Sequence, residues 1–212
     1  MGDQRGTIRL YTCQTDAVLE AIRRDGVCFS KEEYVRRKYE ESAPIFLTAY
    51  RWFVGEAQRF VPKPPGAQFP YWAFQDLYSM DQSGGHVLAL DVPREEAVLF
   101  DLYDWNKIVC LKYLGETEKE EKAFHQMLAQ CGANENQVML TAFYPQWKQE
   151  ILESWGRLFR HHERLKDGDN TGVGCGRSKR SGSPSGDPIC KTRTGGCSRR
   201  KIEEASLWIG PK

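Results

Sequence analysis

Residues of the types that perform chemistry are few and scattered in this chain. No G-x-x-x-x-G-K-[ST] loop, G-x-G-x-x-G turn or H-E-x-x-H helix is present, so the common phosphate-binding and zinc-protease signatures are missing. Of the four histidines two are adjacent, which leaves His86 and His125 as the separate imidazoles of the body. The alternating charges around His125 predict a solvated helix surface. His86 opens a strand after two glycines, where it either faces a cleft or is a plain loop residue.

Two carboxylates and one thiol lie near expected element ends. Asp91 is expected to face solvent or a turn amide, and Asp101 to cap a helix that begins near Tyr103. Cys13 has no identifiable histidine partner, so we predict no cysteine nucleophile. The three cysteines nearest the C-terminus have fourteen and six residues between them, which matches no paired zinc spacing. The catalytic residues therefore stay unassigned, and no metal site is predicted.

The stretch PPGAQFPYWAFQDLY, residues 64–78, sets five aromatic residues behind a proline-rich bend. The prolines exclude a helix and hold the chain extended, which predicts a short strand. In a strand Tyr71 and Ala73 share one face while Trp72 and Phe74 share the other. One face can close the core, and the other borders either a cleft or a packed helix.

Apolar periodicity predicts the elements that would position these groups. TIRLYT, residues 7–12, alternates as a strand, and a helix capped by Thr15 follows and stops at Asp25-Gly26. Its apolar residues Val18, Leu19 and Ile22 are expected to face inward. Ser30 and Glu33 have capping-box spacing for a short charged helix. The remaining expected elements are a helix opened by 42–44 with an aromatic core stripe, a buried strand 86–92, a strand 97–100, and helices 103–113, 116–130 and one entered at 145.

These elements predict an α+β fold: a single domain with a few short strands surrounded by helices, plus a disordered basic C-terminal tail. The expected boundaries are 1–165 for the globular domain and 166–212 for the tail. With 212 residues and 40% hydrophobic residues, the chain can bury one sizeable core. No apolar run reaches membrane-spanning length and no export signal is visible, so we expect no membrane partner and a cytoplasmic location.

The tail differs from the body in charge and composition. Residues 170–201 contain eight Lys or Arg against one Asp, with seven Gly, five Ser and no aromatic residue. Such a segment cannot offset its ordering entropy by burial. It could hold nucleic acid or an acidic protein through charge, or be solvated without a partner, or come from a shifted reading frame.

Two resemblances come from longer stretches. LYTCQTDAVLEAIRRDGV, FPYWAF, LALDVPREEAVLFDLYDW and EILESWGRLF, in this order, resemble a family of small bacterial proteins catalogued as a domain of unknown function. That resemblance covers roughly residues 7–160 and implies no activity.

The second resemblance is to the ADP-ribosyltransferase superfamily. Its members commonly open with a strand carrying Tyr-His or Arg, then a turn, a helix and a glycine, to which residues 10–26 are similar. VLALDVPREEAVLFD, residues 87–101, is similar to their middle strands. The resemblance implies NAD as cofactor, with the nicotinamide amide held by main-chain groups at Tyr11, Thr12 and Gln14 and its ring by Tyr71 or Trp72.

The sequence departs from the superfamily pattern in two places. Thr12 stands where those enzymes have His or Arg, and no late strand carrying a catalytic Glu is readable after Phe159. The alternative hypothesis is a non-catalytic interaction module, in which exposed FPYWAF aromatics and the basic tail bind nucleic acid or an acidic protein. The oligomeric state is left open.

Overall fold

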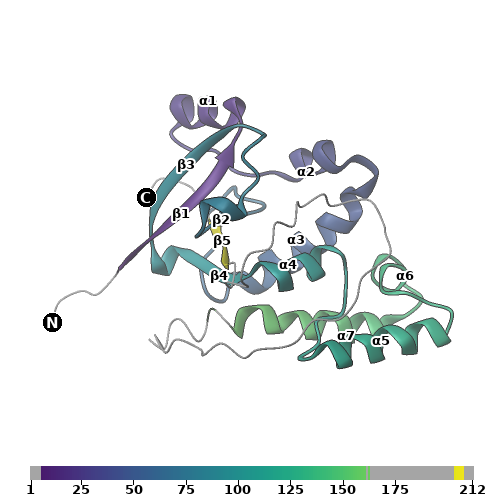
Figure 1. The fold of residues 1–212 in the computed structure, drawn as a ribbon. Coiled ribbons are helices and arrows are strands. Elements are labelled where there is room, and N and C mark those ends of the chain that lie inside the picture. The colour runs from purple at the N-terminus through teal and green to yellow at the C-terminus, as the bar shows by residue number, and fades with distance from the viewer. Residues whose placement is uncertain (1–5, 161, 163–202, 208–212) are drawn as a thin grey trace.

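The structure, a computed structural model, describes residues 6–160, 162 and 203–207 (Figure 1). Five antiparallel strands form one sheet in the order β3-β1-β2-β5-β4. The strands are β1 Thr7–Gln14, β2 Tyr71–Phe74, β3 His86–Pro93, β4 Ala97–Asp101 and β5 Glu203–Leu207. With the helices described below, this confirms the predicted α+β class and single compact domain.

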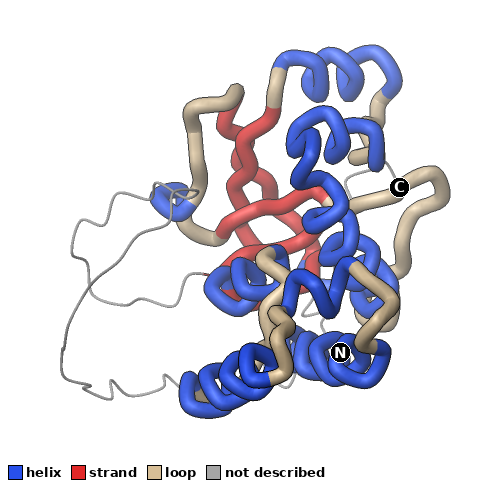
Figure 2. The backbone as a smooth tube through the Cα atoms, turned by 90° about the vertical axis from the view of Figure 1, so that its right-hand side faces the viewer, coloured by secondary structure: helices blue, strands red, loops and turns tan. Residues whose placement is uncertain are grey.

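Seven α-helices are described around this sheet, with short 3₁₀ turns between some of them (Figure 2). Their bounds are α1 Asp16–Asp25, α2 Glu32–Tyr39, α3 Ala43–Ala57, α4 Leu102–Val109, α5 Glu118–Gln130, α6 Glu135–Leu140 and α7 Pro145–Trp155. No described helix is long and apolar enough to cross a membrane.

Two local signals behave as the sequence predicts. Gly26 ends α1 in the left-handed conformation at φ 73°, where a glycine carries no Cβ penalty. The carboxylate of Asp101 accepts hydrogen bonds from the main-chain N–H groups of Tyr103 and Asp104, so Asp101 caps α4. The end of α1 and the start of α4 could therefore be predicted, because each depends on residues that are neighbours in the sequence.

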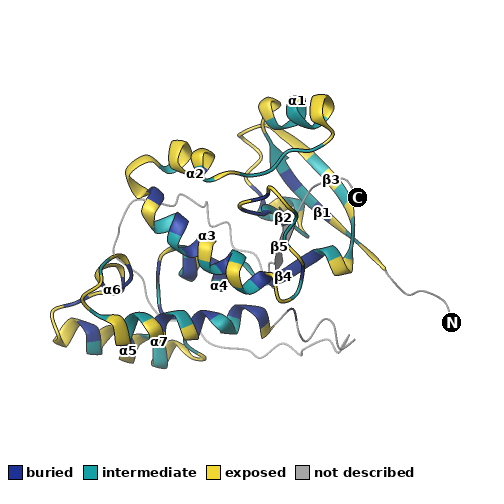
Figure 3. Cartoon of the chain, turned by 180° about the vertical axis from the view of Figure 1, so that it is seen from behind, coloured by how far each residue is buried: buried dark blue, intermediate teal, exposed yellow. Residues whose placement is uncertain are grey.

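The main core fills the space between one sheet face and the helices. Figure 3 shows buried residues concentrated along α3, α4, α7 and β4. At its centre the fully buried Phe53 of α3 contacts Trp72, Phe100 and Trp105, with ring centroids 5.2–5.4 Å apart. These edge-to-face contacts confirm that the aromatic stripe of α3 is core.

A second, smaller cluster lies on the opposite face of the sheet. It contains Leu10 of β1, Ala73 of β2 and Leu99 of β4, with Leu90 of β3 packed against them. Thr12 lies two residues after Leu10 and Tyr71 two residues before Ala73, so both belong to this face of the sheet.

Four expectations need correction. A strand does follow Phe159, because β5 lies inside the sheet between β2 and β4; its five residues show no periodicity, and its pairing is entirely long-range. The rest of the predicted tail lies outside the described residues. Ser30 does not cap α2, since Lys31 precedes the helix and Ser30 instead bridges Phe69.

The other correction concerns β3, which was expected to be buried. None of its residues is buried, because β3 is an edge strand with one neighbour and both of its faces lie partly open. The apolar stripe of α1 was likewise expected to face inward. That helix has no buried residue and extends beyond the ends of β1 and β3 (Figure 1).

Candidate functional site

The end of β1 and the start of β2 lie side by side in the sheet. Thr12 is 1% exposed, and its hydroxyl donates to the main-chain oxygen of Trp72 over 2.9 Å. The same hydroxyl accepts a hydrogen bond from Nε2 of Gln14 at 2.7 Å. Within the described residues the side-chain carbonyl oxygen of Gln14 has no hydrogen-bond partner. The chain of hydrogen bonds therefore fixes a carboxamide with one free acceptor at the strand end.

Tyr71 lies on the same sheet face as Thr12 and Gln14, because it alternates with Ala73, which packs beside Leu10. Its ring is half-buried, and its hydroxyl hydrogen-bonds the Cys28 thiol. Burial raises the pKa of the Tyr71 hydroxyl, and the contacts with Cys28 and the nearby Tyr34 raise it further. The phenol is therefore neutral, and with its proton directed at Cys28 its oxygen can accept a further hydrogen bond.

The other two predicted site residues point elsewhere. Trp72 faces the main core, where its ring lies 4.7 Å from that of Trp105 and 5.2 Å from that of Tyr50. Tyr11 is opposite Phe74 and Ala89 and occupies the sheet face away from Thr12. The structure thus brings together Thr12, Gln14 and Tyr71, and it separates Tyr11 and Trp72 from them.

His86, for which the sequence allowed either a cleft or a loop position, lies beside this strand end. His86 is paired with Gln14 across the β1–β3 ladder, and its Nε2 lies 2.8 Å from Oδ1 of Asp16, the first residue of α1. Two sequence features could have pointed to this contact: the Gly84-Gly85 turn before His86, and the closeness of Asp16 to Gln14 in the chain. Neither feature indicates that His86 and Asp16, 70 positions apart, meet in the fold.

The remaining sequence candidates have structural partners. Asp91 forms an exposed cross-strand ion pair with Arg9 at 2.5 Å. His125 is exposed on α5 as predicted and lies 3.3 Å from the buried carboxylate of Glu135. Among the described residues no group of three or more His, Cys, Asp or Glu could hold a metal ion. These residues stabilise the fold and do not converge on a site.

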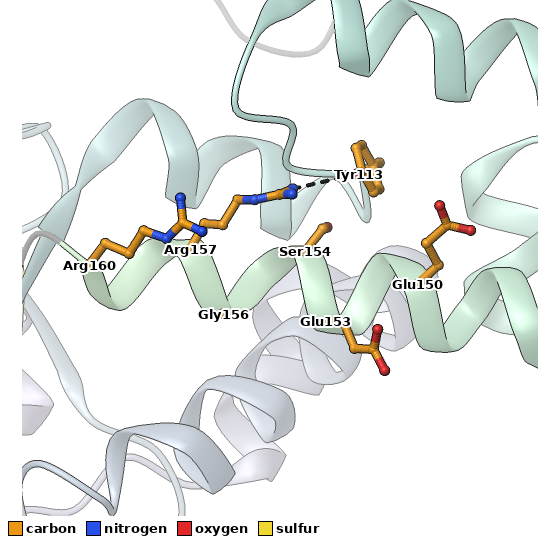
Figure 4. Close-up of a pocket in the computed structure, with 7 residues that line it drawn as sticks. All are labelled: Tyr113, Glu150, Glu153, Ser154, Gly156, Arg157 and Arg160. Carbon is orange, nitrogen blue, oxygen red and sulfur yellow. Dashed lines mark hydrogen bonds between the residues drawn. The ribbon is translucent and has the colours of Figure 1, made fainter.

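An open cavity of about 430 Å³ lies along α7, lined by Tyr113, Glu150, Glu153, Ser154, Gly156, Arg157 and Arg160 (Figure 4). Arg157 donates to the main-chain oxygen of Leu114 and to Glu120 at 3.2 Å, and its guanidinium lies over the Tyr113 ring. The hydroxyl oxygen of Ser154 accepts a hydrogen bond from the main-chain N–H of Leu114. The contacts of Arg157 and Ser154 fasten the loop before α5 onto α7, so these two side chains are used by the fold.

Comparison with known proteins gives one match. A family model described as Domain of unknown function (DUF3841) matches residues 9–178. No curated protein and no solved structure matches. The matched range contains every residue of the strand-end site: Thr12, Gln14, Asp16, Tyr71 and His86.

Proposed function

This chain belongs to the DUF3841 family. From the geometry of the strand ends we propose that it binds a nicotinamide nucleotide at the joined ends of β1 and β2, as the ADP-ribosyltransferases that its sequence resembles do. The observation that carries the proposal is the series of hydrogen bonds from Gln14 to Thr12 and from Thr12 to the main chain of Trp72, which holds Gln14 on the sheet face that also carries Tyr71. The ligand's carboxamide and ring are the groups that this face would recognise.

The chemistry of the face is complementary to a nicotinamide. A primary amide presents two N–H donors and one carbonyl acceptor. The unpaired carbonyl oxygen of Gln14 can accept from one N–H, and the oxygen of the neutral Tyr71 hydroxyl, whose proton is directed at Cys28, can accept from the other. The half-buried Tyr71 ring adds an aromatic surface on which a flat heterocycle can pack.

The alternative of an aromatic interaction surface has less support. Phe69 is buried and Trp72 is packed in the core, so the FPYWAF rings form no exposed patch. The basic segment that would bind nucleic acid or an acidic protein lies outside the described residues. The strand-end site is therefore the better-supported proposal.

Isothermal titration of the intact protein with NAD tests this proposal. We expect Gln14→Ala and Tyr71→Phe each to weaken the dissociation constant about tenfold, which corresponds to ~1.4 kcal/mol of lost binding energy. Gln58→Ala and Tyr78→Phe are matched controls, since Gln58 bonds within α3 and Tyr78 is 93% exposed. Absence of binding heat with the folded intact protein would remove the nicotinamide proposal.

A further inference from the structure

His86 and Asp16 form a polar pair at the rim of the proposed nucleotide site. The ring nitrogen Nε2 of His86 lies 2.8 Å from Oδ1 of Asp16, and both side chains are more than half exposed. Within the part of the chain that the structure describes, Asp16 is the charged group in contact with this ring. The pair is therefore reachable from solvent and from a ligand seated on the adjoining sheet face.

Two features of the local fold hold the pair against the strand end. His86 is the ladder partner of Gln14, which places the imidazole on the strand next to the carboxamide. The preceding Gly85 touches the end of β1 so closely that a Cβ there would lie 2.2 Å from the main-chain oxygen of Gln14. A glycine is thus required at position 85 for the chain to bring His86 beside Gln14.

The contact with Asp16 fixes the chemistry of the ring. A carboxylate only accepts hydrogen bonds, so the imidazole nitrogen that faces it must carry a proton. In the neutral ring Nδ1 then has a free lone pair, and the carboxylate stabilises the imidazolium that forms when Nδ1 takes a proton. This is the arrangement by which an oriented histidine acts as a general base.

We propose that His86, oriented by Asp16, is the general base that activates the nucleophile when the nicotinamide–ribose bond of a bound nucleotide is cleaved. The inference rests on the proposed function. The bond between C1′ and the nicotinamide nitrogen breaks, and nicotinamide leaves with the electron pair. The oxygen of water or of an acceptor hydroxyl bonds to C1′, and its proton passes to Nδ1 of His86. Asp16 is a positioning residue in this step.

The test makes two measurements on the full-length protein. One is the rate of nicotinamide release from NAD with water as the nucleophile, and the other is the dissociation constant for NAD. We expect His86→Ala to lower the release rate about 100-fold, within the range for a lost general base, while NAD affinity changes less than twofold. Free imidazole should restore part of the rate, because the exposed site can admit it. His125→Gln, on the distant α5, is the matched control.

The dependence of the rate on pH separates a chemical role from a structural one. The release rate of the intact protein should depend on pH, because a general base acts only in its unprotonated form, and His86→Ala should lose this dependence. Asp16→Asn should lower the rate without abolishing binding. NAD bound but never cleaved, or an unchanged rate in His86→Ala, would overturn the inference and leave the binding proposal standing. Absence of NAD binding would overturn both.

Discussion

The hydroxyl of Thr12 donates a hydrogen bond to the main-chain oxygen of Trp72 over 2.9 Å and so joins β1 to β2, whose ladder contains one residue pair, Tyr11 with Phe74. We predict that Thr12→Val, which keeps the shape but removes the hydroxyl, lowers the free energy of unfolding by about 1–3 kcal/mol. The buried carbonyl and the Gln14 amide would each lose a partner. Urea denaturation measures the change.

Thr48→Val is the control for this substitution, because the Thr48 hydroxyl bonds the main-chain oxygen of Pro44 within α3. Its loss should cost less, since that oxygen lies at an exposed helix start. Equal stabilities for Thr12→Val and the unsubstituted protein would show that the strand junction does not depend on this bond.

Phe53 lies at the centre of the aromatic core. It is fully buried and contacts the rings of Trp72, Phe100, Trp105 and Phe159. Phe53→Ala should cost about 3–5 kcal/mol, because it removes buried area and leaves a cavity, and Phe53→Leu should cost less. Denaturant midpoints of the two variants give the difference. Tyr78→Ala, at a 93% exposed position, should stay within about 0.5 kcal/mol of the parent.

The elements that could be predicted from the sequence are those with local signals. The strand at β1, the glycine that ends α1 and the Asp101 cap of α4 each depend on neighbouring residues. Helix α6 was missed although Asn134 and Gln137 form a capping box, because its six residues are too short for an apolar period.

The site was predictable only in part, because it is assembled by pairing between distant residues. The strand alternation separated Tyr71 from Trp72 but could not say which one faces the core. That choice depends on α3 and α4, which cover the Trp72 side. The approach of His86 to Asp16 and the insertion of β5 between β2 and β4 are set by sheet topology, for which a single sequence contains no periodic signal.

The Asp101 cap provides a third prediction. Its Oδ1 accepts from the main-chain N–H groups of Tyr103 and Asp104 at 2.8 and 3.2 Å. Asp101→Ala should lower the free energy of unfolding by about 1 kcal/mol, whereas Asp101→Asn retains a capping oxygen and should cost less than half of that. Thermal unfolding followed by circular dichroism compares the two, and equal losses would contradict the capping role.

Glu135 makes the stability depend on pH. Burial disfavours its charge, yet hydrogen bonds from Lys112, its own main-chain N–H and His125 hold the pKa of the carboxyl below its ordinary value of 4.5. A lowered pKa in the folded state stabilises the fold above that value, and this contribution disappears as the pH falls below 4.5 through the folded-state pKa.

We therefore expect Glu135→Gln to be less stable than the parent at pH 7 and to approach it as the pH falls below 4.5. Urea unfolding between about pH 3 and 7, the span over which carboxylates titrate, measures the difference. Glu118→Gln is the control, since the Glu118 side chain is 84% exposed and its contact with Lys122 is 3.8 Å long. A stability difference for Glu135→Gln that is constant over this range would contradict the assignment.

The last prediction concerns β5, whose central position makes the sheet depend on residues near the end of the chain. The main chain of Ala205 is paired with Ala73 of β2 on one side and Leu99 of β4 on the other. Proline has no N–H to donate and is excluded from central strands, so Ala205→Pro should cost about 3 kcal/mol or more. Ala205→Gly keeps the N–H group and should cost about 0.5–1 kcal/mol. Hydrogen exchange at β2 and β4 provides the local readout, because loss of β5 would leave both strands with an unpaired edge. Unchanged protection in Ala205→Pro would show that β2 and β4 do not need β5.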